Sequence, residues 1–361
     1  MENKKKLLIR LIKWIISGFL YYTKFLTLWE FIGEKIYGRK FVILCYHVIS
    51  NDYFKPQMAV SIESFKKQME FLAKNYNVVS LEELIDTVKQ NKTLPRKAVT
   101  ITFDDGYTDN YINAYPILKD NKLPATIFLA TDYIGTGKLL WFDKVWQVLK
   151  NYGDLSKIEI PENICEEDLR AQLLNILMDN SLEKDVAVDL VTSLMKKMNI
   201  KERTALIKYI VENSPHQKQE DSLMLSWEQV IEMSKNRISI QGHTKSHQNL
   251  KEISEKEAKI EIIEGKKEIE KRINKKVTCF SYTYGEFNDR IKALVSKADF
   301  DCACTTIHGN NRLNSDIFEL KRINVTENLS LDFRNRYSKT IFATKLTGIF
   351  DLPLLRKLRK W

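Results

Sequence analysis

Cysteine and histidine are both scarce in this sequence, with five of each among 361 residues. The cysteines are odd in number, and no two of them have the spacing of a metal site. This pattern favours reduced thiols that pack in the interior, and a reducing compartment. Zinc-finger spacings and RNA-binding aromatic motifs are also absent, so we expect no nucleic-acid partner despite a net charge of +10. Anionic lipid or an acidic substrate fits that charge instead.

Long uncharged runs are absent too. In the apolar, basic stretch KKKLLIRLIKWIISGFLYYTKFLTLWEF (4–31), the longest uncharged run is the ten residues from Trp14 to Thr23. A membrane-spanning helix needs about 20, and no small-residue cleavage site follows, as a secretory signal would require. We expect residues 1–39 and 336–361 to form two basic amphipathic segments. They predict a peripheral protein on the anionic cytoplasmic face of the inner (plasma) membrane. Ordinary terminal helices packed on the domain remain the alternative.

From residue 40 onward, strand-like and helix-like segments alternate. We expect strands at 41–46, 98–103, 125–130, 238–240, 277–280 and 301–306, and helices near 61–76, 110–121, 253–273 and 288–298. Such alternation predicts parallel β/α units in an open sheet or a barrel. Over about 142–234 the alternation lapses into acid- and lysine-rich helical sequence. We interpret that stretch as an α-helical insertion in a βα connection.

Two adjacent acidic residues follow one of these strands. The run AVTITF (98–103) ends at Asp104 and Asp105, and Gly106 permits a tight turn directly afterwards. Ligands bind at the C-terminal ends of parallel strands, so one carboxylate could hold a cation while the other moves a proton. Taken alone, the pair also fits a turn acid followed by a helix N-cap.

Two histidines follow another strand. In QGHTKSHQNL (241–250), His243 and His247 are four residues apart, just past ISI (238–240). We expect this spacing to place both imidazoles on one side of a helical turn, a common way to bind a divalent metal. With an acidic ligand, a His-His-Asp set leaves coordination positions open, as a catalytic site requires. A structural role for both histidines is the alternative.

Three motifs together resemble the polysaccharide deacetylases, carbohydrate esterase family 4, which share the NodB-homology domain. These motifs are TFDDGY (102–107), HTKSH (243–247) and FSYTYGEFN (280–288), in the family's order. The resemblance extends over about 40–140 and 225–325, and we expect the barrel domain at 40–335. It implies an α/β fold, a distorted TIM-like (β/α) barrel with seven strands and a metal at the C-terminal mouth.

The resemblance also implies a role for each motif residue. Asp104 corresponds to the general base that activates the attacking water. Asp105, His243 and His247 correspond to the ligands of a divalent ion, expected to be Zn²⁺ with Co²⁺ or Ni²⁺ as alternatives. The backbone N–H of Tyr284 corresponds to a donor to the oxyanion.

The general acid of the family is a histidine after a hydrophobic strand near the C-terminus. Here that pattern stands near the beginning, in FVILCYHVI (41–49). Some family members are circularly permuted in this way, which makes His47 the candidate acid and His308 its rival.

The third motif departs from the family pattern FRYPYG, because Ser281 and Thr283 replace its arginine and proline. The family arginine orients the catalytic acid residue, and we expect Arg322, in LKRINV (320–325), to take over that role. Trp141 lies in an aromatic cluster that could form a wall for a sugar ring, although aromatic residues at such a boundary also serve packing.

These expectations predict a metal-dependent hydrolase that removes N-acetyl groups from an N-acetylhexosamine. The substrate would be a bacterial polysaccharide of the cell envelope or its lipid-linked precursor, and an anionic membrane surface would be a partner. Two alternatives stay open: a deformylase of a lipid-linked amino sugar, and a non-catalytic glycan- or membrane-binding module of the same fold. Loss of site residues, which the second would predict, is not seen in the three motifs.

Overall fold

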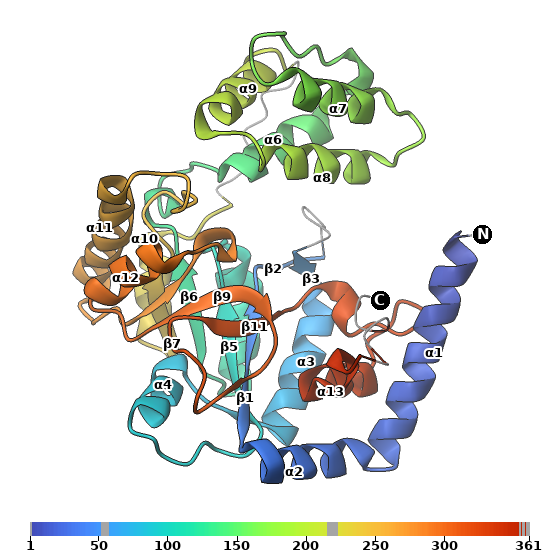
Figure 1. Ribbon diagram of the computed structural model, residues 1–361, viewed down its shortest axis with the longest axis vertical. Helices are drawn as coiled ribbons and strands as arrows, with labels where there is room; N and C mark the ends of the chain where they lie inside the picture. Colours follow the sequence, from blue (N-terminus) through green and yellow to red (C-terminus); the bar gives the residue numbers. More distant parts are fainter. Residues whose placement is uncertain (1, 52–57, 215–222, 354, 356–357, 359–361) are drawn as a thin grey trace. The chain divides into compact units, whose positions relative to one another are not determined.

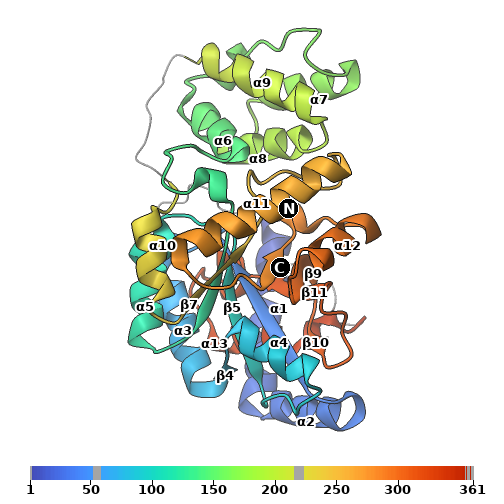
Figure 2. The ribbon, with the colours of Figure 1, turned by 90° about the vertical axis from the view of Figure 1, so that its left-hand side faces the viewer.

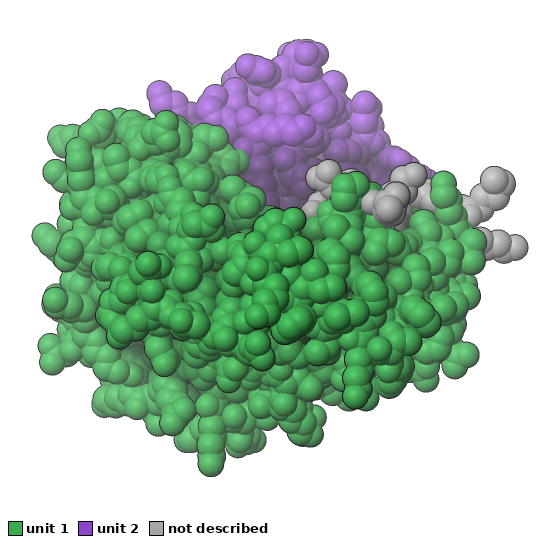
Figure 3. Space-filling view, turned by 60° about the horizontal axis from the view of Figure 1, so that its bottom comes forward, with its two compact units in different colours: residues 1–135, 225–361 green, residues 136–224 purple. Residues whose placement is uncertain are grey.

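The computed structural model describes residues 2–51, 58–214, 223–353, 355 and 358. The chain divides into two compact units (Figure 3), one formed by residues 1–135 with 225–361 and the other by residues 136–224. The first unit contains a β-barrel, and the second is helical.

Seven parallel strands of the first unit close into a barrel (Figures 1 and 2), in the order β1, β11, β9, β8, β7, β6, β5, with β5 pairing back to β1. These strands are β1 (Lys40–Tyr46), β5 (Ala98–Phe103), β6 (Ala125–Leu129), β7 (Ile238–Gly242), β8 (Cys279–Ser281), β9 (Cys302–His308) and β11 (Leu320–Asn324). Shorter strands extend or flank the barrel: β2 (Val48–Ile49), β3 (Ala59–Val60), β4 (Asn77–Val78) and β10 (Asn311–Arg312). The seven-stranded (β/α) barrel expected from the sequence is confirmed.

Side-chain alternation along the strands decides which residues reach the barrel interior. In β5, Val99, Ile101 and Phe103 belong to the apolar cluster shared with the surrounding helices. Ala98 belongs instead to a second cluster that also contains Cys279, Cys302 and Cys304, three of the four cysteines on barrel strands. Because successive side chains of a strand point to opposite faces, the residues in phase with Ala98 face inward. Asp104 continues that inward series.

Helices surround the barrel between the strands (Figures 1 and 2). They are α3 (Ile62–Asn75), α4 (Leu81–Lys89), α5 (Tyr115–Asp120), α10 (Trp227–Ser234), α11 (Glu255–Ile273), α12 (Asp289–Lys297) and α13 (Lys339–Thr347). A π-helical turn at Asn110–Ala114 leads into α5, so the expected helix at 110–121 is present in two pieces.

The second unit contains α6 (Trp141–Asn151), α7 (Glu167–Met178), α8 (Lys184–Met195) and α9 (Ile200–Glu212). Within it, α6 packs on α8 and α9, and α7 packs on α8. The insertion was expected over about 142–234, whereas the compact unit spans residues 136–224. The difference at its end arises because α10 packs on β7 and α11 of the barrel unit.

The N-terminal segment is helical, as expected, and consists of α1 (Glu2–Tyr22) and α2 (Phe25–Tyr37). The C-terminal segment differs from the expected amphipathic surface helix. Every residue from Thr340 to Thr347 in α13 is buried, because α1 covers α13 on the barrel unit. Residues 354, 356–357 and 359–361 of that segment lie outside the described residues. None of the described helices combines the length and apolarity needed to cross a bilayer.

Lys13 on α1 is 1% exposed. Burial, together with the charges of Lys345 and Arg10, lowers the pKa of Lys13 to about 6.

Between that value and the ordinary pKa of lysine, Lys13 holds a proton in the unfolded chain that it lacks in the folded chain. The free energy of unfolding therefore rises with pH over this range. We predict that Lys13→Met raises the free energy of unfolding at pH 7 by about 1–3 kcal/mol, and that the gain shrinks as pH approaches 10. Chemical denaturation at several pH values measures this, with exposed Lys5→Met as the control; equal effects of both variants would contradict the prediction.

Candidate active site

Asp104 and Asp105 lie directly after β5, and their carboxylates have different partners. Asp105 has a left-handed backbone, with φ 74°, and Gly106 follows with φ 87°. A Cβ on Gly106 would lie 2.6 Å from the side chain of Leu129, so only glycine fits this turn. The turn lets Asp104 face Arg322 while Asp105 faces two histidines. The guanidinium beside Asp104 and the imidazoles beside Asp105 therefore offset the repulsion between the two adjacent carboxylates.

Arg322, on β11, holds Asp104 in a bidentate ion pair. The two guanidinium nitrogens donate to Oδ1 at 2.7 Å and to Oδ2 at 2.6 Å, and both side chains are buried. Ser281 accepts from Arg322 at 3.0 Å and donates to Asp104 at 3.3 Å. Burial alone would raise the pKa of Asp104, but the guanidinium outweighs it and lowers that pKa to about 2. The structure thus brings Arg322 to the carboxylate that the family resemblance implies as the base.

Asp105, His243 and His247 converge on one point. Oδ1 of Asp105 lies 3.4 Å from Nε2 of His243 and 3.2 Å from Nε2 of His247, and all three side chains are buried. One ligand atom from each residue lies within 4.8 Å of the others. Burial would raise the pKa of Asp105, but the two imidazoles beside its carboxylate lower that pKa well below its usual range.

The donor set suits a divalent metal. Nδ1 of His243 lies 2.7 Å from the carbonyl oxygen of Ser281, which can only accept, so Nδ1 carries the proton. The Nε2 lone pair of His243 is then directed at Asp105 and is available to a cation. Two imidazoles and a carboxylate are the ligands of catalytic zinc sites with open positions.

The two histidines do not lie on a helical turn, so that expectation was wrong. Residues 243–247 form a loop in which Thr244 and His247 have φ of 67° and 55°. The loop is held by Glu261 of α11, which accepts from the backbone N–H of Lys245 at 3.0 Å and of Ser246 at 2.7 Å. A tertiary contact, rather than helical spacing, brings the imidazoles together.

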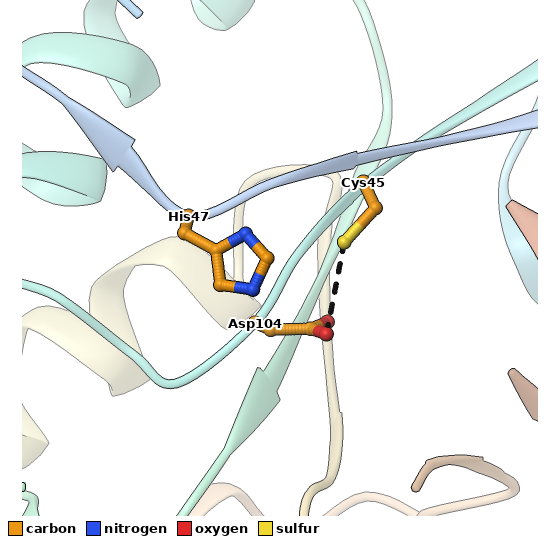
Figure 4. A group of neighbouring side chains, drawn as sticks. All are labelled: Cys45, His47 and Asp104. Atoms are coloured by element: carbon orange, nitrogen blue, oxygen red, sulfur yellow. Dashed lines mark hydrogen bonds between the residues drawn. The ribbon is translucent and has the colours of Figure 1, made fainter. Parts of the chain in front are cut away.

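Cys45 on β1 and His47 directly after β1 lie beside Asp104 (Figure 4), and Sγ of Cys45 lies 3.7 Å from Oδ2 of Asp104. The possible ligand atoms of these three residues all lie within 4.8 Å of one another. Asn110 donates to the backbone carbonyl of His47 at 2.8 Å, which fixes the chain at this point. Burial lowers the pKa of His47 in spite of the nearby Asp105 and Asp104 carboxylates.

The rival histidine has another partner. Nε2 of His308 lies 3.1 Å from Oδ1 of Asp351, and His308 belongs to neither cluster of possible ligands among the described residues. The geometry therefore brings His47, and not His308, to the proposed base.

Tyr284 lies beside the candidate metal ligands. Its ring packs edge-on against His247, with centroids 4.9 Å apart, and its φ of 59° places it in a tight turn. Gly285 follows with φ 69°, and a Cβ there would lie 2.0 Å from Oγ1 of Thr306. Thr283, at the family's proline position, donates to the carbonyl of Gln248 at 2.6 Å. This bond joins the third motif to the histidine loop.

Trp141 is the first residue of α6, in the second unit. Its ring packs edge-on against Phe142, and the Arg203 guanidinium lies 5.0 Å from the ring centroid. Its role in sugar binding stays a prediction.

Sequence reasoning missed three residues of the site: Cys45, Ser281 and Glu261. The position of Cys45 could have been found, because it lies two residues before His47 on the same side of a strand. Ser281 held a motif position and was noted only as a departure. Nothing local marks Glu261, which lies in the middle of a charged helix.

The Arg322–Asp104 pair yields a prediction about activity. Arg322→Lys keeps the positive charge but loses the planar guanidinium that makes two parallel hydrogen bonds to Asp104. We therefore expect kcat to fall about 10- to 100-fold while metal content is unchanged. Steady-state kinetics with metal analysis measure this, and exposed Arg237→Lys is the control. Equal kcat values for the two variants would show that the bidentate geometry is dispensable.

Comparisons with known proteins agree with these motifs. The family profile described as polysaccharide deacetylase matches residues 91–156 and 173–303, more than half of the chain. YxkH of Bacillus subtilis is 24% identical over 292 residues, which cover 81% of this chain and 73% of YxkH. The poly-β-1,6-N-acetyl-D-glucosamine N-deacetylase of Staphylococcus epidermidis is 38% identical over 79 residues, but the match covers only 22% of this chain and 27% of that enzyme.

Solved structures show the same fold. The Streptococcus pyogenes deacetylase PplD, in complex with acetate, matches with a TM-score of 0.54 at 20% identity, covering 82% of this chain and 96% of PplD. IcaB from Ammonifex degensii matches with a TM-score of 0.52 at 18% identity, covering 86% of this chain and 98% of IcaB. The profile match carries the assignment: the chain belongs to the polysaccharide deacetylase family and is a carbohydrate N-deacetylase, a hydrolase.

Proposed function

We propose that this enzyme is metal-dependent and removes N-acetyl groups from an N-acetylhexosamine in a bacterial surface glycan or its lipid-linked precursor. One observation carries the proposal: Asp104, held by Arg322, lies next in sequence to Asp105, whose carboxylate meets two imidazoles. A proton acceptor and a cation site thus adjoin each other at the end of β5.

Each side chain has a place in the reaction. A divalent cation on Asp105, His243 and His247 would supply a Lewis acid that acidifies water and polarises the amide carbonyl. Asp104 takes the proton of the attacking water, and Arg322 keeps this carboxylate ionised and aimed. The backbone N–H of Tyr284 donates to the oxyanion.

His47 protonates the departing amine, because its imidazole lies within 4.8 Å of Asp104. We predict that His47→Gln lowers kcat about 100- to 1,000-fold, since the amine leaves poorly without a proton donor. His308→Gln is the matched comparison and should stay within about twofold of wild type, the size of a surface effect. Kinetics of acetate release from the same substrate measure both. The reverse order of effects would make His308 the acid.

The relatives and the charge of the chain support the more specific substrate, an N-acetylhexosamine in a surface glycan or its lipid-linked precursor. The Staphylococcus epidermidis relative is named for a poly-β-1,6-N-acetyl-D-glucosamine substrate. The basic and apolar N-terminal sequence supports a lipid-linked sugar presented at the cytoplasmic face of the membrane. For the metal we propose Zn²⁺, with Co²⁺ and Ni²⁺ able to replace it, because histidine and carboxylate ligands accept all three.

The test uses the full chain, stripped of metal and reloaded with Zn²⁺, Co²⁺ or Ni²⁺. N-acetylglucosamine oligomers and membrane lipid extracts serve as substrates, and mass analysis follows acetate, formate and the free amine. Acetate release that requires added metal supports the proposal. Formate release from the lipid extract would make the protein a deformylase, and full activity of the stripped protein would overturn the metal role.

A further inference from the structure

The two N-terminal helices expose an unusual amount of apolar surface. Among the described residues, 21 large apolar side chains are exposed, and 13 of them lie on α1 and α2. These are Leu7, Leu8, Ile12, Trp14, Ile15, Phe19, Tyr22, Phe25, Leu28, Phe31, Ile32, Ile36 and Tyr37. Phe19 and Tyr22 are 67% and 69% exposed. We call these 13 side chains the N-terminal apolar face.

The opposite side of α1 is buried against the barrel unit and mixes polar with apolar side chains. Lys13 and Ser17 are 1% and 0% exposed, Leu20 is 9% exposed, and α1 packs there against α13. Arg10 donates to the backbone carbonyl of Asp332 at 2.6 Å. A helix on the surface of a water-soluble domain normally buries its apolar stripe and exposes its polar one. Helix α1 departs from this arrangement, because seven of its large apolar side chains stay exposed while Lys13 and Ser17 are buried beside Leu20.

The acidic residues of α2 are also turned inward. Glu30 pairs with Lys40 at 3.9 Å and with Lys97 at 3.7 Å, at the barrel end opposite the active site. Glu34 pairs with Arg39 at 2.7 Å and Arg96 at 3.4 Å. Both acidic side chains that the structure describes on these two helices are thus neutralised by the barrel.

Basic residues border the N-terminal apolar face. Lys5, Lys24 and Lys35 are exposed, at the start of α1, between the helices and near the end of α2. Apolar and aromatic side chains flanked by exposed cations are the composition of helices that lie in the plane of an anionic bilayer. A second copy of this chain fits less well, because pairing two such faces would bring like charges together.

A groove beside α1 adds to this surface. It has a volume of about 540 Å³ and is lined by Trp14, Ile15, Gly18 and Tyr22 on one side and by residues 337–340 on the other. The Nζ of Lys339 lies 5.9 Å from the ring centroid of Tyr22. An apolar wall next to a cation suits an acyl chain with its phosphate above it.

We propose that α1 and α2 form a docking surface that binds the face of an anionic phospholipid bilayer, with the N-terminal apolar face inserted between the lipids. The proposal concerns binding and stands independently of the deacetylation reaction, so either can fail alone.

Flotation of the full chain with vesicles tests the docking surface. We expect binding to phosphatidylcholine vesicles that contain phosphatidylglycerol, and weaker binding at high salt or to phosphatidylcholine alone. Ile12→Glu should lower partitioning about tenfold or more, because a charge replaces an apolar side chain in the lipid. Ile260→Glu is the matched control, since Ile12 and Ile260 are both 40% exposed on a helix. Phe19→Glu should act like Ile12→Glu.

Acetate release from a soluble oligosaccharide should be unchanged in all three variants, which separates docking from catalysis. Equal partitioning of Ile12→Glu and Ile260→Glu would overturn the proposal. So would equal binding to neutral and anionic vesicles. The face would instead be assigned to a second copy of the chain if the wild type formed a dimer in sedimentation equilibrium. In that case Phe19→Glu would dissociate the dimer, and the wild type would not bind vesicles.

Discussion

Asp105→Ala is expected to lower acetate release at least about 1,000-fold and to leave the purified protein without stoichiometric metal. The carboxylate is the only anionic member of its set, and its Oδ1 lies 3.4 Å and 3.2 Å from the two imidazole nitrogens. Without it, only the two imidazoles remain, and two ligands bind a divalent cation far more weakly than three. Metal analysis by mass spectrometry and kinetics on the same preparation measure both effects.

The control for this variant is Asp120→Ala, which removes an exposed carboxylate at the end of α5. It should keep both metal and activity. If Asp105→Ala retained metal at one equivalent, the Asp105–His243–His247 set would not be the binding site. Circular dichroism of both variants shows whether any loss comes from unfolding.

Asp104→Asn is expected to reduce kcat about 100- to 10,000-fold while metal content stays at the wild-type level. The amide has the size of the carboxylate but cannot accept the proton of the attacking water. It also leaves the Arg322 guanidinium, 1% exposed, without its counter-charge. Breaking a buried pair in this way costs about 3–5 kcal/mol of stability. The variant should therefore melt at a lower temperature than the wild type.

The contrast between the two neighbouring aspartates is the decisive comparison. Loss of metal in Asp105→Ala and retention of metal in Asp104→Asn would show that Asp105 is a metal ligand and that Asp104 is not. If the activity of Asp104→Asn stayed within about tenfold of wild type, a residue other than Asp104 would be the general base. Kinetics must be measured below the melting temperature of the variant, so that the stability effect does not enter kcat.

Much of the candidate site could be predicted from local sequence. Asp104 and Asp105 follow a fully buried strand, and the histidines follow another, so parallel strand ends bring them to one mouth. The alternation of strands and helices indicated parallel β/α units and the helical insertion, but it left an open sheet and a barrel as alternatives, and the family resemblance implied the barrel. The conformation around His243 and His247 could not be predicted, because Glu261 on a separate helix holds their loop. The burial of α13 beneath α1 could not be predicted either, because the sequence of a terminal helix does not show whether another helix covers it.

Local pattern was enough to predict six of the seven barrel strands and the positions of the acidic pair and the histidine pair at strand ends, because alternation and residue type are local properties. Which of these groups lie close together depends on the tertiary fold. Arg322 reaches Asp104 across 218 positions of sequence because the barrel brings β11, β1 and β5 side by side. The tertiary structure also decided which face of α1 is covered, since that depends on where α13 packs. Contacts between distant segments follow from closure of the barrel, which no local pattern encodes.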